Sequence, residues 1–313
     1  MNRKTIVIIT SILLLATTIF GVYHFLQKPK DTGFIILSSK VESDRVTYIQ
    51  KCDFPESLDE LSSLSFTTIN ASESDMRYIA NNFADMSIIK EIVPLENGET
   101  HLEGASSLMR LKGKNNFLSI SLTKDSLHNI WNETQTILKA DQIKDELLSY
   151  LPETQCEVYL MGVFLGSETI ENNASVIHTV NVKYGFTYEG IPVTGNGGIL
   201  SIGLCNGRLI EIEAHIPYLE AKSKVAIITP EKALNRFLEQ KKVSEYLLNA
   251  YGTDTDIEIT IDSFQLVYYY NFLESWTGDM AIYYKISGKE KVLSSSGELL
   301  YSRNYVEMIT ATT

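Results

Sequence analysis

Residues 184–213 read YGFTYEGIPVTGNGGILSIGLCNGRLIEIE and carry the clearest pattern in the chain. Apolar and polar residues alternate on both sides of a middle part that is rich in glycine and carries one proline. Alternation with a period of two is typical of strands, and glycine and proline are the usual residues of the turns that join them. The stretch therefore predicts strands joined by a hairpin connection.

A glycine-rich ligand loop is the alternative interpretation of Gly195-Asn196-Gly197-Gly198. Loops that bind phosphate present backbone N–H groups at the start of a helix, and a lysine followed by serine or threonine completes the best-known motif. Here the glycines lead into ILSIGL, which has the pattern of a strand. The turn interpretation is therefore favoured, and no cofactor is expected at this loop.

Two segments that lie 100 positions apart share an unusual helical pattern. ILKADQIKDELLSYL at 137–151 matches FLEQKKVSEYLLNAY at 237–251, with leucines and branched residues in the same places. Both segments also put a polar residue on the apolar row, Asp141 in the first and Lys241 in the second. The shared irregularity indicates a repeated unit.

Strand patterns follow both segments, so the repeated unit is a helix followed by an antiparallel sheet. We expect the two helices, over 130–151 and 230–251, to cover their sheets in the same way. The expected fold class is α+β, with an N-terminal transmembrane helix followed by tandem helix-plus-antiparallel-sheet modules. The expected domains are a tail, anchor and linker at 1–33, a diverged α+β module at 34–122, a middle α+β module at 123–222 and a C-terminal α+β module at 223–313.

The N-terminus predicts a membrane anchor. Arg3 and Lys4 precede an uncharged stretch from Thr5 to Leu26, which is long enough to cross a bilayer as a helix. A very short N-terminal tail normally stays inside, so we expect a single-pass protein of the cell membrane with the bulk of the chain extracytoplasmic. The alternative is a cleaved signal peptide, although Ala16-Thr17-Thr18 is a poor cleavage site.

Composition excludes two classes of protein. The formal net charge of −12 argues against nucleic-acid binding, which needs a basic face. The three cysteines, Cys52, Cys156 and Cys205, allow one disulfide at most, which argues against a small scaffold held together by disulfides.

Motifs for chemistry are weak throughout the 313 residues. Ser121 and Lys124 have the spacing of a serine acyltransferase pair, but the further motifs of that mechanism do not occur. The five histidines, at 24, 101, 128, 178 and 215, show no metal-binding spacing. We therefore expect a protein that is not an enzyme, with no catalytic, cofactor-binding or metal-binding residues.

Aromatic residues cluster in VYYYNFLESW, residues 267–276. Alternation puts Tyr268 and Tyr270 on one face of a strand and Tyr269 on the other. Such tyrosines brace a sheet through cross-strand contacts, or they anchor a partner protein, since tyrosine is enriched at interfaces. We favour bracing, and we name Tyr268, Tyr270 and Trp276 as the candidate partner-binding residues.

A family resemblance rests on three stretches. TVNVKYGFTYEGIPVTGNGGILSIGLCNGRLIEIE at 179–213 resembles the strand-hairpin-strand pattern of PepSY-like and thermolysin-propeptide-like domains. TPEKAL at 229–234 and SSSGELL at 294–300 look like the same class. One anchor followed by repeated modules is similar to the YycH/YycI-type accessory proteins of Gram-positive sensor kinases.

The resemblance implies a non-enzymatic regulatory protein of a two-component system or of an envelope protease. Its partners would be the membrane, through the N-terminal helix, and an envelope protein such as a sensor kinase. The alternatives are a cell-envelope hydrolase or transferase, and an assembly module that binds a peptide or a glycan. The first alternative requires a cleft with perturbed acids or an activated nucleophile.

Overall fold

The computed structural model divides the chain into two compact units. Unit 1 comprises Met1–Asp53, Lys242–Phe264 and Ser287–Val306, and unit 2 comprises Phe54–Lys241, Gln265–Ile286 and Glu307–Thr313. The structure describes residues 35–37, 46–67, 78–79, 81–83, 91–94, 99–103, 107–112, 117–122, 132–171, 174–195, 197–240, 250–251, 255–270 and 278–313.

Unit 2 is built on a large sheet. Strand β9 pairs antiparallel with β8 along one edge and with β10 and β11 along the other, and β12, β7, β6, β5 and β4 continue outward from β11. A separate two-stranded sheet pairs β13 with β3. The strands are β3 Glu60–Thr67, β4 Glu91–Pro94, β5 Glu99–Glu103, β6 Ser107–Lys112, β7 Phe117–Leu122, β8 Glu157–Glu171, β9 Ala174–Tyr188, β10 Ile191–Gly195, β11 Ile199–Cys205, β12 Arg208–His215 and β13 Tyr218–Ala226.

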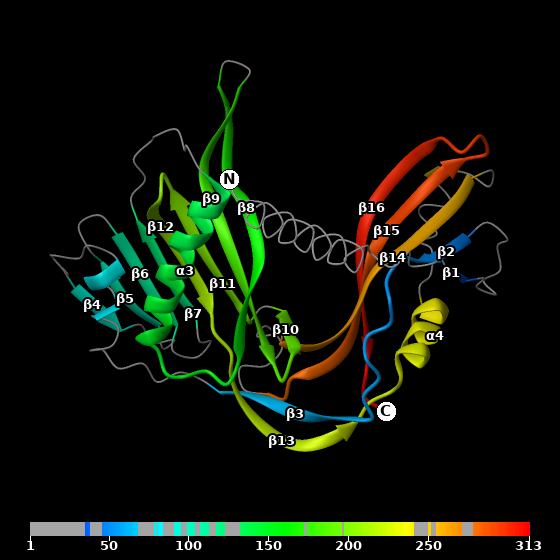
Figure 1. Ribbon diagram of the computed structural model, residues 1–313, viewed down its shortest axis with the longest axis horizontal. Coiled ribbons are helices and arrows are strands. Elements are labelled where there is room, and N and C mark those ends of the chain that lie inside the picture. The colour runs from blue at the N-terminus through cyan, green and yellow to red at the C-terminus, as the bar shows by residue number, and fades with distance from the viewer. Residues whose placement is uncertain are drawn as a thin grey trace, which may run out of the picture. The chain divides into compact units, whose positions relative to one another are not determined.

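Helix α3, Glu133–Ser149, covers this sheet, and Figure 1 shows it across the strands. Asn132 caps the helix, because its side-chain oxygen accepts a hydrogen bond from the Gln135 backbone N–H at 3.1 Å. Ala140, Ile143 and Leu147 are buried, at the spacing of one helical face. That face contacts β9 and β11. A second helix of unit 2, α4, spans Pro230–Gln240.

Unit 1 contains β1 Ile35–Leu37 and β2 Val46–Gln50, together with parts of three long strands. These are β14 Thr255–Tyr270, β15 Ala281–Ser294 and β16 Leu299–Thr310, whose other ends belong to unit 2. Within unit 1, β2 pairs antiparallel with β1 and parallel with β14. The buried residues of unit 1 include Tyr48, Ile259 and Glu290. The Glu290 carboxylate forms an ion pair with Arg303 at 2.6 Å.

The prediction of strands joined by hairpin turns in residues 184–213 is confirmed, but the turns are not at the glycine-rich middle. Strands β10 and β11, on either side of it, both pair with β9 and not with each other. Strands β9 and β10 are joined by a two-residue turn, and so are β11 and β12. Gly195 and Gly198, which flank the connection from β10 to β11, have φ values of 101° and 78°. Glycine adopts such angles without a steric penalty from a Cβ atom, so these two glycines shape the sheet.

The predicted fold class, α+β with tandem helix-plus-sheet modules, is wrong. Most of the described residues are strand, and the strands after the two helices do not repeat. Four strands, β8, β9, β11 and β12, form the antiparallel succession after α3, whereas three strands, β14, β15 and β16, form it after α4. In addition, β10 of the first expected module pairs parallel with β14 of the second. The prediction is wrong because similar helices do not imply similar sheets: strand pairing is decided by contacts far apart in sequence.

No helix in the described part of the chain is long and apolar enough to cross a membrane. The expected anchor at Thr5–Leu26 lies outside the described residues. The four-domain division stays a prediction, and its boundaries differ from those of the two compact units.

Candidate functional site

The candidate site is a cavity of about 660 Å³ in unit 2. Its volume lies within the range of pockets that bind small molecules or peptide side chains. Four segments far apart in the chain meet there: the end of β3, the loop before β8, the turn after β9 and the start of β13. The lining residues are Thr67, Gln155, Tyr188, Glu189, Leu219, Glu220 and Ala221.

Tyr188 provides the aromatic part of the lining. Its ring packs edge-on against the ring of Tyr268, with centroids 6.1 Å apart. Tyr268 is itself fully buried and donates a hydrogen bond from its hydroxyl to the Ser62 carbonyl at 3.0 Å. Burial, with a smaller contribution from Glu189, raises the pKa of the Tyr188 hydroxyl. Tyr188 therefore lines the cavity with a neutral aromatic ring, and the ring of Tyr268 packs against it and supports it.

Strand β13 provides the apolar part of the lining and an unpaired edge. Leu219 is buried in it, whereas Glu220 and Ala221 are exposed. Among the described strands β13 pairs with β3 alone, so the backbone groups along its other edge have no strand partner there. An edge of this kind is a template for one more strand.

Hydrogen bonds fix the loop that carries Gln155. The Thr154 hydroxyl donates to the Pro217 carbonyl at 2.6 Å, and the Tyr218 hydroxyl donates to the Pro152 carbonyl at 3.1 Å. The Thr67 hydroxyl donates to the Tyr218 carbonyl at 3.1 Å. These bonds tie the loop and the end of β3 to the start of β13. The polar groups of the cavity therefore stand on a fixed frame.

Two carboxylates, those of Glu189 and Glu220, line the cavity. Neither forms a hydrogen bond or an ion pair with any residue in the described part of the chain. The neighbouring cations are already paired: Lys224 Nζ lies 2.9 Å from Glu60 Oε1, and Lys222 pairs with Asp279. Lys224 also interacts with Glu189, but more weakly than with Glu60, so the cavity keeps a negative charge that is only partly compensated.

The groups near the cavity are poor nucleophiles. Burial raises the pKa of the Cys156 thiol to about 11, and a thiol reacts as its thiolate. The pKa of the Tyr188 hydroxyl is raised as well, so it does not ionise near neutral pH. The arrangement is suited to holding a ligand through shape, apolar contact and charge.

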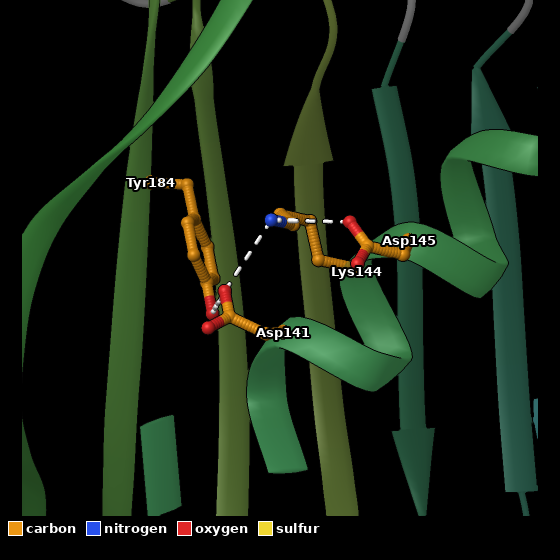
Figure 2. Close-up of polar contacts among 4 residues, drawn as sticks. All are labelled: Asp141, Lys144, Asp145 and Tyr184. Atoms are coloured by element: carbon orange, nitrogen blue, oxygen red, sulfur yellow. Dashed lines mark hydrogen bonds and ion pairs between the residues drawn. The ribbon is translucent and has the colours of Figure 1, made fainter. Parts of the chain in front are cut away.

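A polar cluster on α3 accounts for Asp141, the residue that interrupts the apolar row of the helix (Figure 2). The Tyr184 hydroxyl of β9 donates to Asp141 Oδ1 at 3.0 Å. Lys144 Nζ lies 3.3 Å from Asp141 Oδ1, 3.1 Å from Asp145 Oδ1, and 5.2 Å from the centroid of the Tyr184 ring. Burial and Asp141 raise the pKa of Tyr184, so the phenol stays a donor. The cluster fixes α3 on the sheet.

The structure places two of the three candidate partner-binding residues inside unit 2. Tyr268 is buried behind Tyr188, and Tyr270 stacks on Phe66 with centroids 3.9 Å apart. Both rings therefore contribute to packing. Trp276 lies outside the described residues, and the partner-binding role of the three stays a prediction.

The other motifs singled out in the sequence are not brought together in the described part of the chain. Ser121 lies in β7 opposite Glu211, while Lys124 is outside the described residues. His215 lies in β12, with Nε2 3.8 Å from Glu213 Oε1. Among the described residues no group of three or more His, Cys, Asp or Glu side chains is placed to hold a metal ion.

A second exposed feature of unit 2 is the apolar part of β8. Four of its side chains are 44–51% exposed: Leu160, Met161, Phe164 and Leu165. Successive strand residues point to opposite faces, so apolar surface is exposed on both sides of this edge strand. Exposed apolar surface in one place is typical of protein contact.

The cavity was not predicted from the sequence, because its lining comes from segments up to 154 positions apart, from Thr67 to Ala221. One signal was visible. Glu189-Gly190 occupies the two-residue turn between β9 and β10, where asparagine or aspartate usually precedes glycine. A glutamate in that place marks a position where turn geometry alone does not explain the side chain.

No protein-family model and no curated protein matches the sequence. The structural neighbours include an uncharacterized protein from Eubacterium rectale ATCC 33656, with 13% identity and a TM-score of 0.48 over 90% of this chain and 92% of that chain. YycH from Bacillus subtilis has 14% identity and a TM-score of 0.40, and the match covers 84% of this chain and 57% of the YycH chain. The Bacillus megaterium YpeB C-terminal domain has 11% identity and a TM-score of 0.39 over 77% of this chain and 98% of that domain. YycH and the YpeB C-terminal domain are thus among the structural neighbours of this chain, at low identity.

Proposed function

We propose that this protein is a non-enzymatic binding protein, which takes an extended segment of another envelope protein into the cavity of unit 2 and thereby regulates that protein. The observation that carries the proposal is the cavity lined by β13, a strand whose other edge has no partner among the described strands. An extended segment that pairs with such an edge gains affinity from main-chain hydrogen bonds and specificity from side-chain pockets.

Three features favour a protein segment over a small molecule. The lining mixes an aromatic ring, an apolar side chain and polar groups, as alternating side chains of a strand require. Strand β13, which lines the cavity, has an edge without a strand partner among the described strands. The exposed apolar side chains of β8, with Leu165 at 51%, supply further surface for contact with a protein.

The class of partner rests on the sequence. Similarity of residues 179–213 to PepSY-like domains, and of the whole organisation to YycH/YycI-type proteins, favours a sensor histidine kinase or an envelope protease. Location outside the cytoplasm rests on the uncharged stretch Thr5–Leu26. Regulation then follows from differential affinity: a segment that is accessible in one state of the partner and hidden in the other shifts the partner between them.

The test is site-specific photocrosslinking in intact cells of the native host. A photoreactive amino acid replaces Gln155, which lines the cavity, and the captured proteins are identified by mass spectrometry. The matched control carries the same amino acid at Arg208, an exposed residue outside the cavity. A third strain combines the Gln155 crosslinker with Ala221→Trp, which fills part of the cavity.

The proposal expects one dominant adduct at position 155 that is missing at position 208 and reduced by Ala221→Trp. The same adducts at both positions, or no adduct at position 155 in protein of normal abundance, would contradict it. If an added substrate is turned over, and the turnover depends on the cavity residues, the protein is an enzyme and the proposal is wrong.

A further inference from the structure

We infer that the segment taken up by the cavity is basic, with a lysine or arginine side chain that pairs with Glu189 and Glu220. This inference rests on the proposed function and adds the chemistry of the partner. It follows from three independent features: the charge of the cavity, the nature of its walls and the backbone of the turn that carries Glu189.

The first feature is the negative charge of the cavity. Glu189 comes from the turn after β9 and Glu220 from β13, so carboxylates from two elements line one cavity. The nearby lysines, Lys222 and Lys224, are engaged by Asp279 and Glu60. Lys224 interacts with Glu189 only weakly, so a cation supplied by a partner can pair with both carboxylates. The net charge of −12 also attracts a basic partner at long range.

The second feature is the lining beside the carboxylates. Tyr188 presents an aromatic ring, and Leu219 presents an apolar side chain. Lysine and arginine have long apolar stems that pack on such surfaces while the charged head reaches a carboxylate. The face of a tyrosine ring also attracts a cation directly. An acidic segment would bring like charge to Glu189 and Glu220, so the cavity discriminates against it.

The third feature is the backbone at Glu189. Its φ of 49° lies in the left-handed region, and Gly190 follows with φ 77°. Asparagine, aspartate and glycine favour this region, whereas glutamate has no short side chain that hydrogen-bonds its own turn. A glutamate in this position costs stability relative to asparagine. That cost is explained if the carboxylate binds a ligand.

The experiment measures binding of fluorescein-labelled ten-residue peptides to the full chain by fluorescence anisotropy. One probe alternates lysine and valine, a second alternates glutamate and valine, and a third alternates threonine and valine. The variants are Glu189→Gln, Glu220→Gln and their combination. The matched control is Glu211→Gln, which neutralises an exposed carboxylate of β12 outside the cavity.

The inference expects the lysine peptide to bind more tightly than the other two. Each cavity variant weakens its binding about two- to fivefold, as for exposed ion pairs, and the combination weakens it further. Added salt reduces the difference between wild type and variants, and Glu211→Gln has no effect. Equal binding of the lysine and threonine peptides would overturn the inference and leave the proposed function standing. Binding of no peptide, together with no cavity-dependent crosslink, would overturn both.

Discussion

Two hairpin turns of unit 2 have nearly the same backbone and different side chains. The turn between β9 and β10 is Glu189-Gly190, with φ values of 49° and 77°. The turn between β11 and β12 is Asn206-Gly207, with φ values of 50° and 72°. Both are two-residue hairpin turns with positive φ at both central residues, as type I′ turns require. The geometry is shared, so the difference at the first position needs another cause.

The cause lies in what surrounds each turn. Asn206-Gly207 is the residue pair that this turn type prefers, so it suits the geometry of the turn. Glu189 lines the cavity, and among the described residues its carboxylate forms no hydrogen bond or close ion pair. Glu189 suits its backbone conformation poorly and lines the candidate site, whereas Asn206 suits the same conformation and lies outside the site. A residue that conflicts with its local backbone is therefore a pointer to function.

The largest effect is expected when a glycine at positive φ also lacks space for a side chain. A Cβ atom on Gly195 would lie 2.1 Å from the Tyr270 carbonyl oxygen, whereas nothing lies within 4 Å of a Cβ on Gly207. Gly195→Ala should therefore cost about 3 kcal/mol or more, because backbone strain and a clash add. Gly207→Ala should cost only about 1 kcal/mol.

Urea unfolding of both variants measures this difference. Equal losses would contradict the close packing of β10 against β14. Equal losses would also mean that the glycines of residues 184–213 are needed only because they adopt positive φ.

The next effect concerns the support behind the glutamate turn. Tyr268→Phe removes the hydroxyl that donates to the Ser62 carbonyl and leaves that carbonyl without its partner. The expected loss is about 1–2 kcal/mol, because a buried acceptor left unsatisfied costs its desolvation. Thermal melting measures the loss, with Tyr269→Phe as the control, since Tyr269 lies on the other face of β14. Equal destabilisation by the two variants would show that the hydroxyl bond of Tyr268 does not brace this region.

The third effect tests the asparagine turn. Asn206→Glu gives the β11–β12 hairpin the same first residue as the β9–β10 hairpin. The expected loss is about 0.5–1 kcal/mol, because glutamate tolerates the left-handed region less well than asparagine. Peptide binding should not change, because this turn does not line the cavity. If the variant is as stable as the wild type, glutamate does not destabilise this type of turn. That result would contradict the argument that Glu189 lowers the stability of the fold.

The smallest effect concerns a carboxylate that does have a partner. Glu213 of β12 is 56% exposed and lies 3.8 Å from His215, and the interaction with His215 lowers its pKa. A lowered pKa contributes stability above the ordinary carboxyl pKa, and that stability is lost as the pH falls through the folded value. Glu213→Gln should cost a few tenths of a kcal/mol at most near pH 5.5, after allowance for solvent screening, and nothing near pH 2. Melting at both pH values measures it, and an equal cost at the two would contradict the pairing.

Sequence reasoning succeeded where local chemistry decides the outcome. The alternation and glycines of residues 184–213 predicted strands and turns, because pairing across a short turn needs only neighbouring residues. The alternation of Tyr268 and Tyr270 predicted a shared face, and both are buried. These features depend on a few residues that are adjacent in the chain.

Sequence reasoning failed where distant contacts decide. Asp141 looked like a slip in a helix, and its explanation is the Tyr184 hydroxyl, 43 positions away. The expected repetition of helix and sheet is wrong, because β10 pairs with β14, a strand more than 70 positions further along the chain. The cavity likewise depends on four separate segments, so its residues carried no common motif.

The role of Glu189 is tested with Glu189→Asn, which gives both turns the same residue pair. The melting temperature and the affinity for the lysine–valine peptide are measured on the same preparation. The account predicts a melting temperature higher by about 1–3 °C, because asparagine suits the left-handed region, and an affinity about two- to fivefold weaker, because the carboxylate is lost. An unchanged affinity, or a lower melting temperature, would contradict the claim that Glu189 is kept for binding at the expense of the fold.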